Sequence, residues 1–546
     1  MNTLSSPIQA SSGSRLTARW VLVGSILASS MVFIDGTALS IALPAMQAAL
    51  GATAADLLWV TNGFSLPLAA FLLLGGGLGD CFGRKRIFLI GIVVFTNASL
   101  ACGLAPGVTA LIAARVIQGV GGALMIPGAL AMVSTFFGPA ERGRAIGTWS
   151  AFSVLATAIG PVLGGLLARG GLWRWVFFIN LPLAAVVLAV LLVKIPRDRK
   201  SDHQVRVDWW GALSISIGLA GINYGLIGWS KTGMVDVSVL TQLLVGGAAL
   251  ILFVVLQRRV QQPLLPLDIF KSRTLTAASL LSLLFFMAFH GMLFFLPLNL
   301  IQVQGYDPAL AGLTQLPLMA LLILLSRFAG SIVDRHGPRL PLTIGPLVAG
   351  VGFWLFSMPL TTAGPREFAT TFLPGLLLVG AGLGLTAAPL STTIMDSMSS
   401  ERLGLASGIN STLSRLAGVL AIAILGPVAI IAFNHSLEAK TAPLRLPLEM
   451  RAQLARESAK LAEARPPADL SLEASAEVKR CIKLAFVDAF RLIARLTAVL
   501  SWLGALLVAC LLEGGAMRKP VCQKCLGHST GLTLSAAFGK PGDLKR

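Results

Sequence analysis

The chain of 546 residues is 55% hydrophobic and only 12% charged, and its mean hydropathy is +0.80. This composition supplies too little polar surface for a soluble globule of that size, so it predicts an integral membrane protein. The formal net charge of +19 lies mainly in short loops between apolar runs. Lys and Arg in such loops set membrane topology, so no nucleic-acid partner is expected.

Apolar runs of about 20 residues, the length that spans a bilayer, occur roughly fourteen times along the chain. An even number of spans puts both termini on one side of the membrane. The short loops on that side carry most of the Lys and Arg, which predicts a multi-pass protein of the inner (plasma) membrane with both termini in the cytoplasm. The expected spans are 20–44, 55–78, 87–105, 107–136, 144–168, 175–194, 209–229, 238–257, 275–301, 309–335, 340–360, 369–397, 403–433 and 490–513.

Asp35 lies within the first expected span. An ionised carboxylate in hydrocarbon is costly, so this side chain must face a cavity, pair with a cation or spend time protonated. The segment resembles the L-D-x-T-x-x-N-x-A-L-P signature of the drug:proton antiporters, with Ser40 at the asparagine position. The resemblance implies a role in proton coupling. The matching residues are Asp35, Thr37, Ala42, Leu43 and Pro44.

A glycine-rich basic turn follows the second expected span. Its small residues Gly76 and Gly79 should let two backbones approach closely, and Gly83 can adopt a left-handed conformation. Asp80 can bind a helix N-terminus or a following cation. The turn resembles the loop between helices two and three of the major facilitator superfamily, whose G-x-L-x-D-x-x-G-R-K signature latches the cytoplasmic gate. The matching residues are Gly76, Leu78, Asp80, Gly83, Arg84 and Lys85, and Cys81 stands where arginine is common.

Arg115 lies near the start of the fourth expected span, at membrane depth, where a cation needs an acidic or carbonyl partner unless it reaches the interface. With Gln118 and Gly119 it resembles the superfamily motif R-x-x-Q-G-x-G-x-A, which implies that the arginine assists proton transfer.

The fifth expected span contains a proline between glycines, which predicts a bend and a groove for close helix packing. It resembles G-x-x-x-G-P-x-x-G-G, the superfamily pattern of antiporters, with Ala156 at the first glycine. The resemblance implies a seal against leak. The matching residues are Gly160, Pro161, Gly164 and Gly165.

The spacing of the basic turn recurs later in the chain, after the second span of another six. The resemblance therefore implies an all-α membrane fold with two parallel six-helix halves, and a 6+2+6 arrangement as in the fourteen-helix drug:proton antiporter family. The repeated positions are Gly330, Asp334 and Gly337. The expected regions are 1–19 (cytoplasmic N-terminus), 20–194 (first half), 195–274 (linker with two inserted helices), 275–513 (second half, with 434–489 outside) and 514–546 (cytoplasmic tail).

Three weaker features complete the pattern. His290 is a titratable group within the membrane and either carries protons or makes a structural hydrogen bond. The stretch 442–480 is expected to be one or two surface helices, as a solvated spacer rather than a lid. Cys522 and Cys525 lack the further ligands that zinc requires, so no metal is expected. The small-residue face of the thirteenth span is assigned to packing: Gly404, Gly408, Asn410, Arg415 and Gly418.

These features predict a proton-coupled antiporter that exports lipophilic, often cationic compounds, not an enzyme. No phosphate-binding loop is found, so ATP is not the expected energy source, and no cofactor is expected. The expected partners are a small-molecule substrate, protons and the lipid bilayer, with a periplasmic adaptor protein as a further candidate. Two alternatives stay open: an exporter of one endogenous metabolite, and a membrane sensor or structural protein that does not transport.

Overall fold

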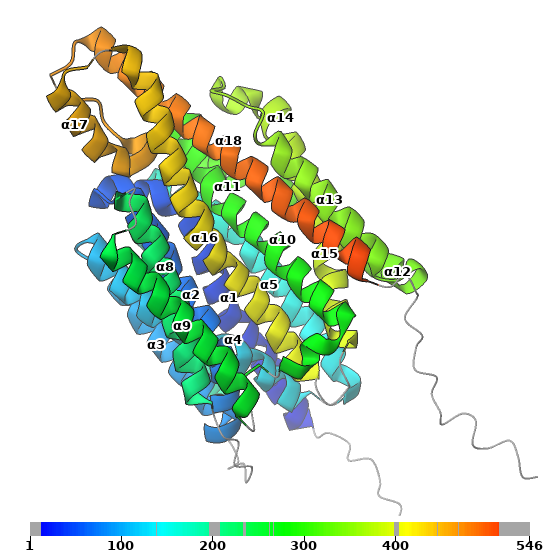
Figure 1. The fold of residues 1–546 in the computed structure, drawn as a ribbon. Helices are drawn as coiled ribbons and strands as arrows, with labels where there is room; N and C mark the ends of the chain where they lie inside the picture. The colour runs from blue at the N-terminus through cyan, green and yellow to red at the C-terminus, as the bar shows by residue number, and fades with distance from the viewer. Residues whose placement is uncertain are drawn as a thin grey trace, which may run out of the picture.

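The computed structural model describes residues 12–137, 139–195, 208–232, 236–260, 263–265, 267–397, 403–444, 446–467 and 469–512. This part of the chain is a bundle of long helices that run in similar directions (Figure 1). Thirteen helical runs in it are long and apolar enough to cross a membrane. The expected span 340–360 corresponds to α13 (Arg339–Leu355), which is apolar but only 17 residues long. The all-α membrane class is confirmed, and the count of fourteen spans remains a prediction.

The first half packs around α4. Glycines make this possible, because a Cβ at Gly119 would overlap the Phe64 carbonyl of α2, and one at Gly121 would overlap the Phe95 backbone of α3. Backbones in contact at glycine are a common way to pack membrane helices. The helices of this half are α1 (Ser12–Leu50), α2 (Ala54–Phe82), α3 (Arg84–Leu104), α4 (Val108–Phe136), α5 (Pro139–Arg169), α6 (Trp175–Phe178) and α7 (Asn180–Lys194).

The second half packs around α15, α16 and α18. Gly337 ends α12 at φ +77°, as Gly83 ends α2 at φ +100°, so the repeated glycine has the same left-handed role in both halves. The helices are α10 (Arg273–Leu298) with its π-helical extension η2 (Asn299–Val303), α11 (Pro308–Leu313), α12 (Leu316–His336), α13, η3 (Gly364–Glu367), α14 (Phe368–Thr371), α15 (Leu373–Asp396), α16 (Leu403–Thr441) and α18 (Leu472–Leu511).

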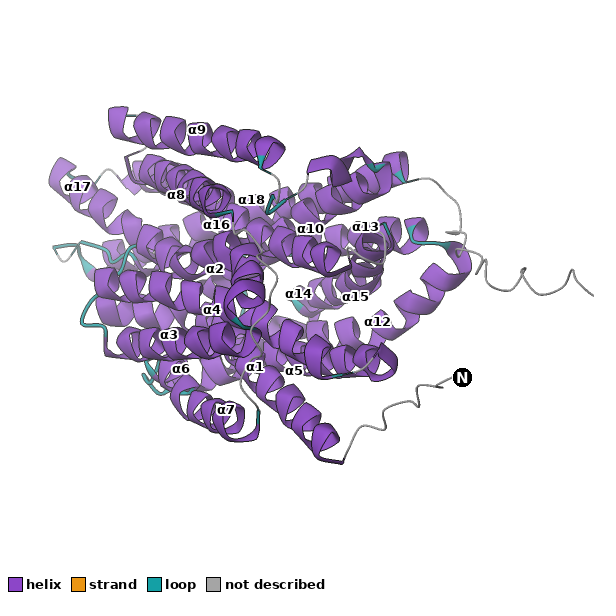
Figure 2. Cartoon of the chain, turned by 90° about the horizontal axis from the view of Figure 1, so that it is seen from below, coloured by secondary structure: helices purple, strands orange, loops and turns teal. Residues whose placement is uncertain are grey.

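Two further helices lie on one side of the bundle (Figure 2). α8 (Trp209–Thr232) contacts α2 of the first half and α16 of the second, while α9 (Val237–Arg259) packs mainly on α8. A buried hydrogen bond from Asn62 to Asn223, 2.5 Å long, fixes α8 against α2. α8 therefore spans the junction between the halves, and α9 is the most peripheral helix.

The connection between α16 and α18 forms a cap on one end of the bundle (Figure 1). This cap segment, residues 442–471, contains η5 (Ala442–Leu444), α17 (Leu448–Glu457) and η6 (Ser458–Glu463). Half of its described residues are exposed, as in a spacer, while Leu454 and Leu461 are buried. The expected boundaries were wrong here, because α16 continues to Thr441 and α18 already begins at Leu472.

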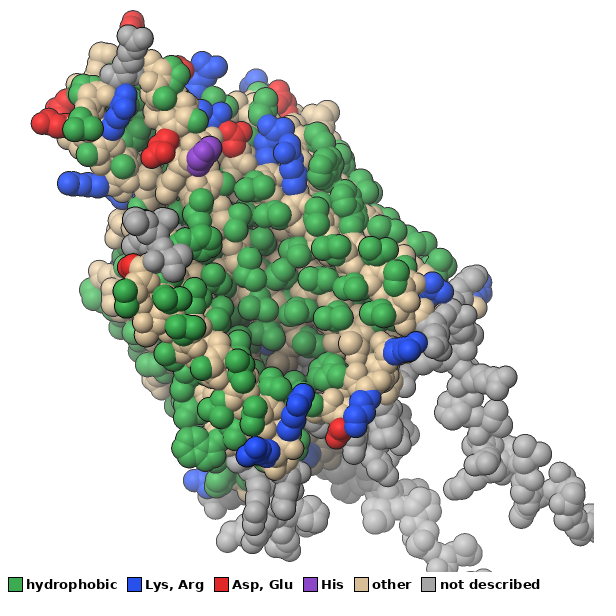
Figure 3. Space-filling model, viewed as in Figure 1, with side chains coloured by type: hydrophobic (Ala, Val, Ile, Leu, Met, Phe, Trp, Pro, Cys, Tyr) green, Lys and Arg blue, Asp and Glu red, His purple; other side chains and the backbone are tan. Residues whose placement is uncertain are grey.

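A belt of hydrophobic side chains surrounds the middle of the molecule in the face that Figure 3 shows, and the Lys, Arg, Asp and Glu side chains gather at its two ends. This distribution matches a bilayer-embedded bundle. The start of α1 and the end of α18 lie at the end opposite the cap segment (Figure 1).

Topology can be tested with reporters. Because cations are concentrated in the loops on the side of the termini, green fluorescent protein fused after Lys200 or Met517 should fluoresce, as it folds in the cytoplasm. Alkaline phosphatase fused after Lys460 should be active, because the cap segment is expected outside. Fluorescence after Lys460 would contradict the predicted orientation.

Candidate functional site

A cavity of about 430 Å³ lies between the two halves. Its walls come from α1, α2, α4 and α5 on one side and from α10 and α16 on the other, mostly from the middle of each helix. A volume of this size can hold a drug-sized molecule. The wall is rich in aromatic side chains, namely Phe33, Phe64, Trp149, Phe286, Phe289 and Phe294.

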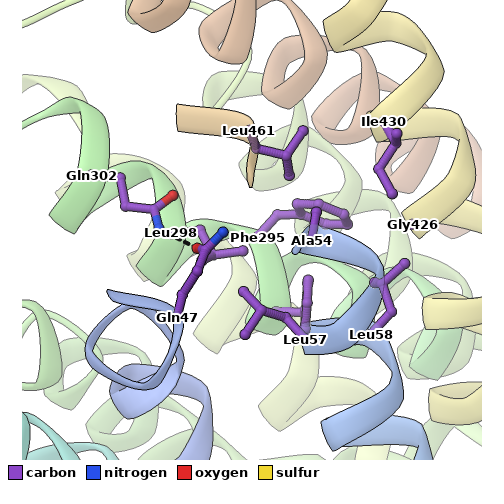
Figure 4. A pocket seen from close by; sticks show the side chains of 11 residues that line it. Gln47, Ala54, Leu57, Leu58, Phe295, Leu298, Gln302, Gly426, Ile430 and Leu461 are labelled. Carbon is purple, nitrogen blue, oxygen red and sulfur yellow. Dashed lines mark hydrogen bonds between the residues drawn. The ribbon is translucent and has the colours of Figure 1, made fainter. Parts of the chain in front are cut away.

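The bundle is closed between this cavity and the cap segment. Gln302 of η2 donates a hydrogen bond of 2.8 Å to Gln47 at the end of α1 (Figure 4). Gln47 in turn donates one of 2.9 Å to the Lys460 carbonyl of the cap segment. Leu461 closes the small apolar pocket beside them, next to Leu58 of α2. The two halves and the cap segment therefore meet at this end.

Two residues of the predicted antiporter motif, Pro161 and Gly165, form a further contact between the halves. A Cβ at Gly165 would overlap the Pro308 carbonyl of α11, and one at Gly312 of α11 would overlap the Pro161 carbonyl of α5. Gly165 and Gly312 are therefore each in direct contact with the backbone of the other half. On the inner side of α5, Gly160 and Gly164 meet the α1 backbone and side chains in the same manner, at Thr37 and Ala38.

Asp35 of α1 is fully buried and forms an ion pair with Arg115 of α4, with a distance of 2.5 Å between Oδ2 and Nη1. Its other oxygen, Oδ1, accepts hydrogen bonds from Gln118 at 2.9 Å and Asn180 at 3.4 Å. Of the three alternatives for this carboxylate, the structure shows pairing with a cation. Asp35 itself is not among the described residues that line the cavity, whereas Arg115 is.

Arg115 is only 1% exposed, so it does not reach the interface, and its predicted acidic partner is confirmed. Nη1 also donates to Gln118 at 2.7 Å, and Nε donates to the Val60 carbonyl at 3.3 Å. The guanidinium lies 4.3 Å from the centroid of the Phe64 ring. Gly119 lies one turn further along α4, and its lack of a Cβ lets α4 contact the backbone of α2 at Phe64. This close contact brings Arg115 within reach of the α2 backbone.

Sequence reasoning did not identify the α3 and α7 residues of this network. Ser99 accepts hydrogen bonds from Gln118 at 3.3 Å and from Asn180 at 3.0 Å, and donates one to the Phe177 carbonyl at 2.9 Å. One buried polar network therefore joins side chains or carbonyls of α1, α2, α3, α4, α6 and α7. A polar residue inside an apolar run is the signal that could have drawn attention to Ser99.

The structure describes the side chains of Arg84 and Lys85 in the predicted gate motif. Arg84 donates to Thr135 of α4 at 2.6 Å, and buried Lys85 donates to the Ile195 carbonyl at 2.6 Å. The expected close approach at Gly76 and Gly79 is wrong, because the backbone of α4 meets Gly75 instead, at Ala123. The glycine of closest contact is thus one residue before the motif. The side chains of Asp80 and Asp334 lie outside the described residues.

His290 and Arg415 both line the cavity. Nδ1 of His290 donates a hydrogen bond of 2.8 Å to the Phe286 carbonyl. The assignment of Asn410, Arg415 and Gly418 to packing alone was wrong, because all three face the cavity. An arginine in an apolar helix was the same signal that identified Arg115, and it applied equally to Arg415.

Within the described part of the chain, no group of three or more His, Cys, Asp or Glu side chains could hold a metal ion. Cys522 and Cys525 lie outside the described residues.

Comparison with known proteins places this site in context. The sequence profile described as "Major Facilitator Superfamily" matches residues 25–422. "Multidrug resistance protein Stp" of Mycobacterium tuberculosis (strain ATCC 25618 / H37Rv) is 34% identical over 420 residues, 76% of this chain and 77% of that protein. "Tetracenomycin C resistance and export protein" of Streptomyces glaucescens is 36% identical, over 72% of this chain and 73% of that protein.

Solved structures agree in fold. A bacterial homologue of the human lysosomal transporter Spinster, in an inward-facing and unoccupied conformation, matches with a TM-score of 0.60 and 16% identity, over 90% of this chain and 97% of that chain. A D-xylose-proton symporter matches with a TM-score of 0.53 and 14% identity, over 91% of this chain and 98% of that chain. At such identities the likeness shows the fold alone.

The glycine contact between α5 and α11 can be tested. Gly165→Ala should push the halves apart, because the added Cβ has no room beside the Pro308 carbonyl. A cost of about 1–3 kcal/mol for overpacking would shift the equilibrium about 5- to 150-fold away from this closed state. Double electron–electron resonance should then measure a longer mean distance between spin labels placed at the exposed residues Leu172 and Leu310.

Gly247→Ala is the matched control, because a Cβ at that α9 position meets nothing within 4 Å. An unchanged distance distribution in Gly165→Ala would show that this contact does not hold the halves together.

Proposed function

The chain belongs to the major facilitator superfamily, and we propose that it acts as a proton-coupled antiporter that exports lipophilic drug-like compounds across the inner membrane, with both termini in the cytoplasm. One observation carries the proposal above the others: the buried Asp35–Arg115 pair, whose arginine forms part of the cavity wall. A titratable carboxylate one side chain away from a substrate-sized cavity can link proton binding to substrate binding.

The names of related proteins support lipophilic drug-like compounds as the exported substrates. Relatives at 34–36% identity are named for multidrug resistance, tetracenomycin C resistance and export, and puromycin resistance. The aromatic wall of the cavity fits compounds of this lipophilic kind. The multidrug name of one relative favours a broader substrate range over a single endogenous metabolite.

Coupling follows from the geometry of the pair. While Asp35 is ionised, it holds the Arg115 guanidinium against α1 and away from the cavity centre. A proton on Asp35 removes that ion pair, and Arg115 keeps its hydrogen bonds to Gln118 and the Val60 carbonyl and its contact with the Phe64 ring. The Arg115 guanidinium is then free to change its position at the cavity wall. Substrate and proton therefore influence each other through Arg115, as reciprocal linkage requires.

We assign the remaining motif residues to the conformational change. Pro161 and Gly165 seal the halves near the cap segment, while Gly160 and Gly164 hold α5 against α1. The gate-motif residues act at the opposite end, namely Gly76, Asp80, Gly83, Arg84 and Lys85. Gln118 orients the Asp35–Arg115 pair. His290 donates a hydrogen bond to the Phe286 carbonyl and lines the cavity, where it is a second candidate for proton coupling. A protein without transport activity is the disfavoured alternative, because unused buried charges are costly in a membrane.

The coupling role of Asp35 can be tested by Asp35→Asn. The variant cannot exchange a proton at this site, so substrate addition to energised inverted vesicles should no longer release protons, and uphill dye transport should be lost. The variant also leaves Arg115 buried without its partner, at a cost of about 3–5 kcal/mol. Its thermal stability must therefore be measured together with transport.

Two further variants separate coupling from folding. Asp35→Asn combined with Arg115→Gln removes both charges, so it should recover much of the stability without recovering proton release. Asp236→Asn is the control, because an asparagine caps α9 as the aspartate does, and it should behave as wild type. A stable Asp35→Asn protein with full uphill transport and unchanged proton release would rule out the coupling role.

A further inference from the structure

The cavity contains an arginine whose charge nothing nearby neutralises. Arg415 of α16 is half-buried, with its exposed part on the cavity, and within the described part of the chain it forms no ion pair. Its guanidinium carbon lies 5.9 Å from the centroid of the Phe33 ring, which is a cation–π contact and leaves the charge in place. The guanidinium therefore offers its charge and its hydrogen-bond donors to whatever fills the cavity.

The other charged groups of the wall do not offset Arg415. The described lining residues include no Asp or Glu. Asp35 lies behind the wall, and its charge is already matched by Arg115 at 2.5 Å. His290 adds no negative charge in any protonation state. With the ion pair counted as neutral, the described cavity wall carries a net positive charge at Arg415.

The surroundings of Arg415 suit an amphipathic ligand. Ser411 and Ser414 lie beside it on the same side of α16 and also face the cavity. Phe286 and Phe289 of the neighbouring helix α10 add aromatic rings to the same side of the cavity. A ligand with an acidic group on an aromatic body could therefore place the acid at Arg415 and the rings against α10.

From this arrangement we infer that the cavity selects lipophilic organic anions, and that Arg415 is the residue that determines the selectivity for charge. The inference rests on the proposed export function and deepens it. It narrows the expectation of lipophilic, often cationic compounds, because a cationic ligand in this state of the protein would meet an unpaired arginine and no acidic side chain among the described lining residues.

The test compares three probes on the purified full-length protein in lipid nanodiscs, by equilibrium dialysis with empty nanodiscs subtracted. Anilinonaphthalene sulfonate is an aromatic anion, N-phenylnaphthylamine is its uncharged parent, and ethidium is a cation. Wild type should bind the sulfonate most tightly. Arg415→Gln should weaken sulfonate binding by about tenfold or more, the loss expected for one hydrogen-bonded charged contact, and change binding of the uncharged parent less than about threefold.

Two control variants complete the comparison. Arg415→Lys keeps the charge and should retain part of the preference for the sulfonate. Arg495→Gln removes an exposed arginine of α18, near Trp354 and not among the cavity lining, and should behave as wild type.

Equal or absent binding of the sulfonate and its parent by wild type would overturn the inference, as would unchanged sulfonate binding in Arg415→Gln. Equal weakening of all three probes in that variant would show a structural role and overturn it as well. Transport in proteoliposomes distinguishes the two proposals. If the sulfonate binds through Arg415 but is not moved by a proton gradient, the export function fails while the anion selectivity stands.

Discussion

Burying the Asp35–Arg115 pair is the constraint on which the first half depends. Removing two charges from water is offset only when their geometry is good and their remaining hydrogen-bond groups are satisfied. Gln118, Asn180 and the Val60 carbonyl supply those partners from α4, α7 and α2. The glycines of α4 bring these helices close enough to do so. Packing and chemistry therefore impose the same requirement on this half.

The contacts between the halves are of a different kind. They include the apolar packing of α2 on α16, where Leu58 meets Gly426, and backbones that meet at glycines. Two glutamine hydrogen bonds and an exposed ion pair of 3.2 Å between Arg169 and Asp307 complete them. An exposed ion pair contributes little to stability. Such contacts close the bundle without deeply buried charges, so separating the halves leaves no charge stranded. The strong interactions hold each half together, and the weaker ones lie where a transporter must open.

The sequence predicted the helices, and it offered pairing with a cation as one of three alternatives for Asp35, because charge in an apolar run is rare and costly. It could not predict which faces meet, because the helices are apolar nearly all round and their periodicity does not distinguish lipid from protein. Asn180 lies 145 residues from its partner Asp35. Arg415 was overlooked because its surrounding glycines indicated packing. The start of α18 was missed because its first turns carry several charges, which lowers the local hydropathy.

The account's central claim is that Asp35 changes protonation as substrate binds. Infrared difference spectroscopy measures this directly, since a protonated carboxyl absorbs at a frequency separate from that of a carboxylate. Substrate binding to the purified protein should change the intensity of a carboxyl band, and this change should be absent from the difference spectrum of Asp35→Asn. A difference spectrum identical in the two proteins would contradict the account and show that the proton is carried by another group.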